Sequence, residues 1–345
     1  MSCDQIVVSC VLVLLGLPPP TLAASVPQER DRVFETSGVL RETIHANRSW
    51  GARNTAADGA YSSVNIAWDK SHSGRWYIEQ QRDGFDMIAI GLTLHDSEVV
   101  DRGVRALEWG FRQQNTDGSF SCDDAFHSTS FFVEAAAHSV LILRADPMGK
   151  AFAPRMDALL DGLARAAQWM TRADVESAGR ARNRPFTHRR FLVGAALGEA
   201  AVVLNDPALR RKSEDYIREG LALQEIDGVN PEKGGHDSNY QAVGLSYALR
   251  YYRLVADAPL QSEMRGPLDK GVRWLAGRVD QNGEISSEGN TRSGGEEKNR
   301  DGTPKGVNYT WAVRTFADWG FISGDTQDEA LARRIWARWQ VVKPT

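Results

Sequence analysis

The apolar residues of this chain recur with the spacing of α-helices along almost its whole length. Apolar positions at i, i+3, i+4 and i+7 mark a helix that buries one face. No convincing stretch alternates between apolar and polar residues, as a half-buried strand would. The sequence therefore predicts an all-α fold, with helices over residues 30–46, 78–95, 97–115, 126–145, 154–173, 188–204, 207–224, 238–256, 263–279, 307–320 and 326–341.

Three similar turns indicate a weak internal repeat. They read Gln-Asn-Thr-Asp-Gly-Ser-Phe from 114, Gln-Glu-Ile-Asp-Gly from 224 and Asp-Gln-Asn-Gly-Glu from 280. Short links between helices alternate with long loops at 174–187, 225–237 and 280–306. Segments 133–143 and 191–203 are apolar nearly all round, as expected of inner helices, whereas 208–223 is rich in charge. We therefore expect an (α/α) toroid of about five to seven helical hairpins, with the long loops on one face.

The N-terminus has the pattern of a secretory leader. An apolar run at 6–17 ends at three prolines, and small residues follow at 23–25. The run is too short to span a bilayer, and no later run approaches that length. The sequence therefore predicts a signal peptide over 1–24, a single toroid domain over 25–345, no membrane span and a secreted or periplasmic location.

Charge and motifs exclude several classes of protein. The net charge is −4, and −3 without the leader's Asp4, whereas a nucleic-acid-binding protein is usually basic. Only Cys122 of the three cysteines lies outside the leader, so we expect neither an internal disulfide nor a cysteine zinc site. Phosphate-binding loops, dinucleotide fingerprints, His-Glu-x-x-His motifs and nucleophile elbows are absent from the sequence. We therefore expect no metal and no cofactor.

Polar residues that folding explains least gather at the entrances to the inner helices. Five segments carry them, at 68–80, 117–128, 182–190, 230–241 and 288–314, and in a toroid they would converge on one cleft. Trp68, Trp76 and Trp311 there could stack on sugar rings or pack in the core. Arginine recognises carboxylates through paired hydrogen bonds, so the basic residues of these segments indicate an anionic ligand. They are Arg75, Arg182, Arg184, Arg189, Arg190, Lys233, Arg292, Lys298, Arg300 and Lys305.

Four histidines bear on the chemistry. His236 follows two glycines and precedes Asp237, which would cap the next helix, so it is either catalytic or a bystander to that cap. His188 and His127 open two other inner helices. His138 lies in the middle of an apolar helix, where we expect a core residue.

Two reactions fit these residue types. β-Elimination from a uronate needs a group that neutralises the carboxylate, a base for the C5 proton and an acid for the leaving oxygen, and Arg, His and Tyr supply all three. An inverting glycoside hydrolase instead needs a carboxyl pair about 6.5–9.5 Å apart. Its candidates are Asp117, Asp123, Asp124, Asp227, Asp237 and Glu284, some of which sit in the repeated turns. A non-catalytic glycan-binding protein is the third possibility.

The leader, the expected toroid and the entrance Gly-Gly-His-Asp-Ser-Asn-Tyr-Gln at 234–241 resemble toroidal polysaccharide lyases, most of all polysaccharide lyase family 38. In sequence the resemblance rests on segments 230–241 and 288–314. It implies cleavage of alginate or polyglucuronate, with an anionic polysaccharide as the partner.

The resemblance also implies roles for single residues. His236 would be the base, and Tyr309 the acid or both acid and base, with Tyr240 competing for the tyrosine role. Arg292 or Arg300 would neutralise the carboxylate, assisted by His188. The remaining substrate-binding candidates are Trp68, Trp76, His127, Arg189, Asn239, Arg300 and Trp311.

Overall fold

The computed structural model describes residues 37–62, 77–299 and 302–342. Within these ranges the backbone forms helices, turns and isolated bridges, and no strand. The prediction of an all-α fold is therefore confirmed for the described part of the chain. The expected signal peptide, Trp68, Trp76 and Arg300 lie outside the described residues.

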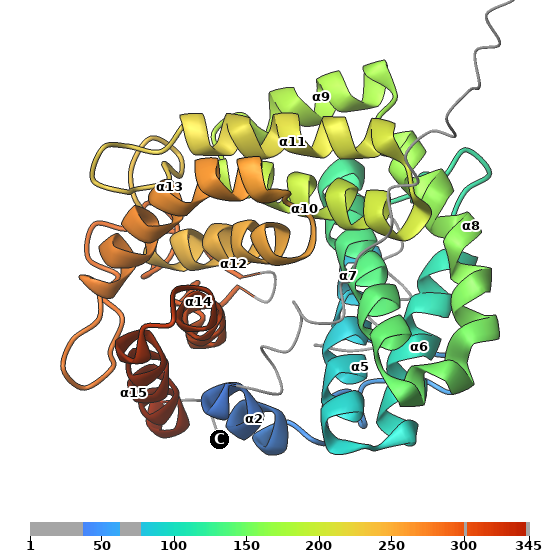
Figure 1. Cartoon of the computed structure of the whole chain (residues 1–345), viewed down its shortest axis with the longest axis horizontal. Coiled ribbons are helices and arrows are strands. Elements are labelled where there is room, and N and C mark those ends of the chain that lie inside the picture. The colour runs from blue at the N-terminus through green and yellow to red at the C-terminus, as the bar shows by residue number, and fades with distance from the viewer. Residues whose placement is uncertain (1–36, 63–76, 300–301, 343–345) are drawn as a thin grey trace, which may run out of the picture.

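Long inner helices follow one another around the middle of the molecule (Figure 1). They are α5 (Asp83–Leu94), α7 (Ala125–Ala145), α10 (Thr187–Leu204), α12 (Ser238–Leu254) and α14 (Tyr309–Ser323). Each contacts the next in this order, and α2 (Gly38–Ala46) contacts both α14 and α5. The two ends of the series therefore meet through α2.

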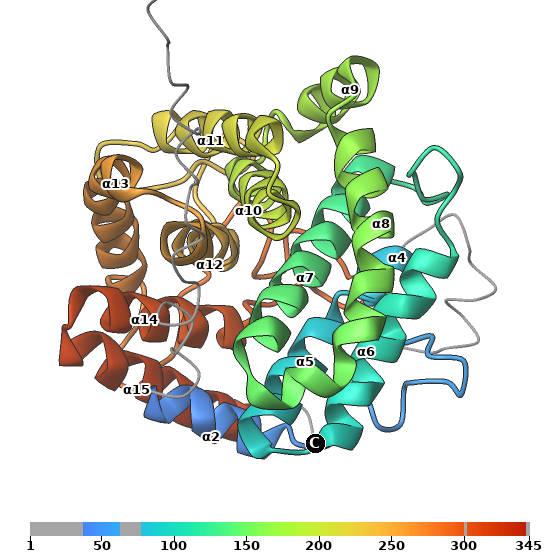
Figure 2. The ribbon, with the colours of Figure 1, turned by 45° about the vertical axis from the view of Figure 1, so that its right-hand side comes forward.

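Each inner helix is followed by an outer helix that packs against it (Figures 1 and 2). The outer helices are α6 (Ser97–Arg112), α8 (Ala153–Met170), α11 (Pro207–Ala222), α13 (Ala258–Ala276) and α15 (Thr326–Val342). The main apolar core lies among these helices and includes Phe132 of α7, Leu192 of α10 and Phe316 of α14. Among the described residues, no helix combines the length and the apolar character needed to cross a bilayer.

The repeated turns serve one structural purpose. Gly118, Gly228 and Gly283 have φ of +90°, +100° and +84°, which favours glycine. A Cβ atom on any of them would stand 2.3 or 2.4 Å from a backbone carbonyl oxygen of α8, α13 or α15, so each turn packs directly on an outer helix. Gly59 makes the same contact with α6 at a φ of +98°, a fourth repeat that the sequence comparison missed.

The prediction of a loop over residues 174–187 is wrong. The sequence predicts a long loop there, between an outer and an inner helix, but α9 (Ala173–Asn183) occupies most of this range. Ion pairs from Arg180 and Lys212 to Glu176 stabilise this helix, and Gly179 lets it approach the ring of Phe126. Polar i,i+4 pairs and one close contact can thus support a short helix that hydrophobic periodicity does not reveal.

Other helix boundaries differ from the expected ones by a few residues. The helix expected at 78–95 is split into α4 (Tyr77–Gln80) and α5. α13 starts five residues before the predicted 263 because Asp257 caps it and accepts a hydrogen bond from the amide of Leu260. A short 3-10 helix, η1 (Pro147–Phe152), precedes α8. Asp96 caps α6, with its carboxylate accepting from the amides at 98 and 99.

Candidate functional site

Asp237 holds together the loops that lead into α12 and α14. One carboxylate oxygen caps α12 by accepting from the amides of Asn239 and Tyr240 at 3.0 and 3.1 Å. The other accepts from the amides of Arg292 and Ser293 at 2.9 and 2.8 Å. Asp237 is 1% exposed, so this carboxylate is a buried anchor that fixes the 288–293 segment against the start of α12.

A tight turn before α12 presents Glu232. Lys233 and Gly234 have positive φ angles of 52° and 82°, and the amide of Glu232 donates to the carbonyl of Gly235 at 2.7 Å. The amide of Lys233 also donates to the carbonyl of Pro185 at 2.7 Å, which ties the turn to the segment before α10. Glu232 is thereby buried beside the first turn of α10.

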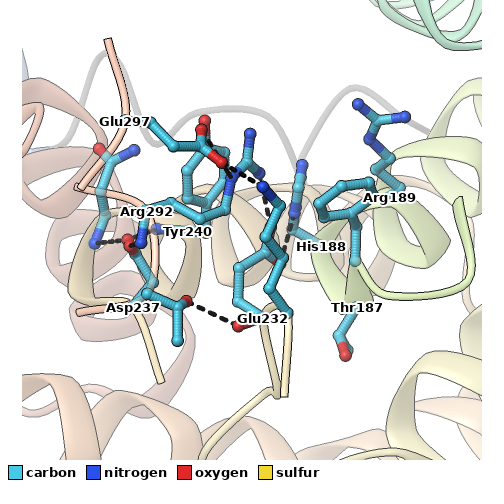
Figure 3. Close-up of polar contacts among 12 residues, drawn as sticks. Thr187, His188, Arg189, Glu232, Asp237, Tyr240, Arg292 and Glu297 are labelled. Carbon is cyan, nitrogen blue, oxygen red and sulfur yellow. Dashed lines mark hydrogen bonds and ion pairs between the residues drawn. The ribbon is translucent and has the colours of Figure 1, made fainter. Parts of the chain in front are cut away.

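Residues from three loop–helix entrances meet around Glu232 and Tyr240, and Figure 3 shows several of them turned toward one another. His188 Nδ1 lies 2.8 Å from one oxygen of Glu232, and Arg292 Nη1 donates to the other at 2.6 Å. This carboxylate therefore fixes an imidazole and a guanidinium at the same time. We call the set the entrance cluster: His188, Glu232, Tyr240, Arg292, Glu297 and Lys305.

Tyr240 is the half-buried member at the centre of the entrance cluster. Its ring lies 4.6 Å from the ring of His188, centroid to centroid, and the Arg292 guanidinium carbon lies 3.8 Å from the ring centroid. Lys305 Nζ donates to the Tyr240 hydroxyl at 3.1 Å. Two cations and an imidazole thus surround one phenol.

Glu297 holds the cations of the entrance cluster in place. Arg292 Nε donates to both of its oxygens at 3.1 Å, and Lys305 and Lys233 donate to it at 2.8 and 2.5 Å. Burial opposes its ionised form, but the lysines and Arg292 outweigh this and lower the pKa of Glu297 to about 2. This carboxylate is therefore ionised throughout the neutral range.

His127 and Arg189 border the entrance cluster. The His127 ring lies 6.4 Å from the ring of His188, and Arg189 Nη1 donates to Asn183 and Asp124 at 2.7 and 3.2 Å. Burial and the nearby charges of Arg189 and His188 hold the pKa of His127 well below its ordinary value. Burial also lowers the pKa of His188, against the opposing effect of Glu232. Both imidazoles are therefore neutral near pH 7.

These two shifts predict a loss of stability in mild acid. Above the ordinary histidine pKa of about 6.5, neither the folded nor the unfolded chain protonates these rings. Below it, the unfolded chain binds protons that the folded chain does not, so the free energy of unfolding falls as the pH falls. One such histidine contributes a slope of up to about 1.4 kcal/mol per pH unit.

We expect His127→Phe to flatten this dependence, measured as urea unfolding between about pH 5 and pH 7.5. The groups that face His127 are Arg82, His188, Arg189 and Arg292, and none of them is altered by this change. His45→Gln, which alters an exposed histidine of α2, is the matched control. Equal slopes for His127→Phe and the unaltered chain would contradict the prediction.

Two residues expected at the centre of the site lie elsewhere. His236 directs Nε2 to the carbonyl oxygen of Glu288 at 3.1 Å, and its ring lies 5.4 Å from that of Trp274 on the outer helix α13. Tyr309 stacks on Trp339 of α15 at 5.6 Å, and burial raises its pKa to about 12. The structure thus brings together Tyr240, His188 and Arg292 among the expected catalytic residues, without His236 or Tyr309.

The other expected binding residues have defined places. Asn239 is buried and accepts from the amide of Asn308 at 2.9 Å, so it fastens the start of α14 to α12. Trp311 borders a cavity of about 310 Å³ between α2, α5, α7, α12 and α14. Its ring lies 5.5 Å from that of Tyr247, which also lines this cavity.

Phe131 lies between His127, which borders the entrance cluster, and Tyr247, which lines the cavity. Its ring lies 4.7 Å from that of His127 on one side and 6.1 Å from that of Tyr247 on the other. Arg82, which lines the cavity, places its guanidinium carbon 4.2 Å from the centroid of the same ring. The two polar regions are therefore neighbours, connected from His188 to Tyr247 through the rings of His127 and Phe131.

Most carboxylates considered for a hydrolase have structural partners. Asp117 and Asp227 accept backbone amides within their own turns, at 3.0 and 3.1 Å. Glu284 pairs with Arg338 at 2.5 Å, and Asp124 pairs with Arg182 and Arg189. A different carboxylate stands out in the cavity, because burial raises the pKa of Asp83 to about 6 despite the nearby Arg82.

Comparison with known proteins does not identify the chain. No family model matches it, and no curated protein matches it in sequence. Its function therefore has to be argued from the two polar regions described above.

Sequence reasoning missed the acidic members of the entrance cluster. Glu232 and Glu297 lie in the polar segments 230–241 and 288–314, but their type differs from the cations, aromatics and histidines that indicate an anionic ligand. A signal was present: a buried arginine or histidine needs an anionic or accepting partner, and each segment contains a glutamate. The sequence does not say which glutamate pairs with which histidine or arginine, because the partners of Glu232 are 44 and 60 residues away in the chain.

Proposed function

We propose that this chain is a secreted or periplasmic polysaccharide lyase that cleaves a uronate polymer, such as alginate or polyglucuronate, by β-elimination. An (α/α) toroid would carry the site, and the series of inner helices that meets through α2 supports that architecture. The observation that carries the proposal is the Tyr240 phenol, held between Lys305 and Arg292 and packed on the neutral ring of His188.

Tyr240 is the proposed acid and base because it is more exposed than the imidazole beside it. His188 is only 3% exposed, whereas Tyr240 is half-buried and can meet a polymer. Lys305, at 3.1 Å, would stabilise negative charge on the Tyr240 oxygen once its proton has left. His188, oriented by Glu232, is a positioning residue for this ring.

The elimination can then be written with its proton accounted for. Arg292 and Lys305 face the uronate carboxylate and stabilise the charge that develops there when the C5 proton leaves. The Tyr240 phenolate, which has released its hydroxyl proton to solvent and is stabilised by Lys305, takes the C5 proton. The electron pair of the C5–H bond forms the C4=C5 double bond, and the C4–O4 bond breaks with its electron pair left on O4. Tyr240 returns the proton to O4, which is a syn elimination with one residue acting as base and then acid.

The direct test is incubation with alginate, with polyglucuronate and with a neutral glucan. We expect ultraviolet absorbance of the unsaturated uronide to grow with new reducing ends for at least one uronate polymer and not for the glucan. Reducing ends without this absorbance would support a hydrolase. Polymer binding without new ends would support a glycan-binding protein.

The hydrolase remains the second candidate because of the cavity. Asp83 and Asp86 both line it, and a carboxyl group with a pKa of about 6 suits a general acid. Asp83→Asn separates the two proposals: it should abolish turnover by a hydrolase and leave β-elimination at the entrance cluster largely intact. Folding of the variant is checked first by circular dichroism.

A further inference from the structure

A second buried group of polar side chains lies on the inner helices, away from the entrance cluster. Glu134 and His138 are one turn apart on α7, and Glu199 lies on the neighbouring helix α10. His138 Nδ1 lies 3.7 Å from an oxygen of Glu199 and 3.9 Å from an oxygen of Glu134. One ligand atom from each of the three residues lies within 4.8 Å of the others.

We propose that Glu134, His138 and Glu199 bind one divalent transition-metal ion, with zinc the best fit, and that this ion ties α7 to α10. The proposal is independent of the proposed lyase activity, since it concerns a different part of the molecule.

The three residues are of the types that bind metal ions, and they are placed as ligands are in helical metalloproteins. Two ligands at i and i+4 on one helix and a third from a facing helix form a three-ligand set of the kind built inside helix bundles. Imidazole nitrogen and carboxylate oxygen are both common ligands of zinc. Glu199 and His138 are 0% exposed and Glu134 is 3% exposed, so the ion would sit in a low-dielectric environment. Arg250 offsets the charge of Glu134, so Glu199 supplies the net negative charge that attracts the cation.

The separations are close to those around a metal. Ligand atoms about 2.1 Å from a tetrahedral zinc stand about 3.4 Å from one another. Closing the observed 3.7 and 3.9 Å edges to that value needs shifts of about half an ångström or less. The edge between Glu134 and Glu199 lies within 4.8 Å and would have to shorten by up to about 1.4 Å, through rotation of the two glutamate side chains.

Arg250 of α12 supplies a hydrogen bond to one of the proposed ligands, as is usual around protein metal sites. Its guanidinium donates to Glu134, and the carbon of that guanidinium lies 5.2 Å from the ring centroid of Phe85. Hydrogen bonds of this kind orient metal-ligating carboxylates. Glu134 and Arg250 also line the cavity, so a water from the cavity can complete the coordination.

The experiment measures metal on the full chain, expressed without a histidine tag in medium with and without added zinc. We expect about one zinc ion per chain by elemental analysis, lost in His138→Gln and kept in the matched control His45→Gln. Removal of the ion by a chelator should lower Tm by several degrees, and added zinc should restore it. The Tm of His138→Gln should not respond to either treatment.

A second measurement needs no variant and covers the case in which His138→Gln does not fold. Cobalt added to the metal-free wild-type chain should give the visible absorption of a tetrahedral site, and zinc should abolish it by competition. Wild-type protein that takes up neither zinc, cobalt nor manganese would overturn the proposal. So would a folded His138→Gln or Glu199→Gln variant that binds the metal as well as the wild type. Either result would mean that the three residues form a buried ion-pair network.

Discussion

Tyr240→Phe is expected to lower the rate of β-elimination by about 10²- to 10⁴-fold, the usual loss when a positioned acid or base is removed. The change deletes only the hydroxyl that accepts the Lys305 hydrogen bond and leaves the ring between His188 and Arg292. The fold should therefore survive, with a loss of free energy of unfolding of about 1 kcal/mol or less. The measurement is kcat and KM on the uronate polymer, and the loss should appear in kcat.

Tyr309→Phe is the matched control. This tyrosine also lies at the start of an inner helix, but its ring stacks on Trp339 of α15, away from the entrance cluster. We expect its kcat to stay close to that of the wild type. If Tyr309→Phe is the inactive variant and Tyr240→Phe is active, the proposed site is wrong, and the assignment implied by the resemblance to polysaccharide lyases is the better one.

Asp237→Ala is expected to have the largest effect on stability, lowering the free energy of unfolding by about 3–5 kcal/mol. Loss of a helix cap typically costs about 1 kcal/mol. Here the same carboxylate also accepts two backbone amides and a hydroxyl from the 292–293 segment, and each buried donor left unsatisfied costs about 1–3 kcal/mol. Urea unfolding measures the change.

Asp96→Ala provides the comparison for this effect. Asp96 caps α6 through two amides but is exposed, so its removal should cost only about 1 kcal/mol. Activity of Asp237→Ala should fall in step with its folded fraction. A variant with unchanged stability and no activity would contradict the anchoring role and make Asp237 a candidate catalytic carboxylate.

Several features of the fold can be derived from the residues alone. Apolar spacing is a local signal, so it predicts the inner helices and their burial, and Asp96 marks a helix start through contacts two and three residues away. The repeated turns can also be recognised in the sequence, because a glycine with positive φ is needed where the chain turns against an outer helix. The turn at Gly59 was readable in the same way, because Asp58-Gly59-Ala60-Tyr61 has the pattern of Asp117-Gly118-Ser119-Phe120, but the sequence prediction did not include it.

The sequence alone does not predict which side chains from distant segments contact one another. His236 and Tyr240 are four residues apart, yet one packs on the outer helix α13 and the other faces His188 and Arg292. The direction of each side chain depends on how residues 288–299 and 302–305 pack over the start of α12, and that packing depends on Asp237, Glu232 and Glu297.

His138 makes the same point for the proposed metal site. As a residue of an apolar helix it was correctly expected to be buried, because periodicity reports burial. Its carboxylate neighbour Glu199 lies 61 residues further along the chain and reaches it only because α7 and α10 pack together. Local spacing thus determined which elements form and which faces are buried. Tertiary packing alone decided which polar groups share a site, because their energies depend on distances between segments that are far apart in sequence.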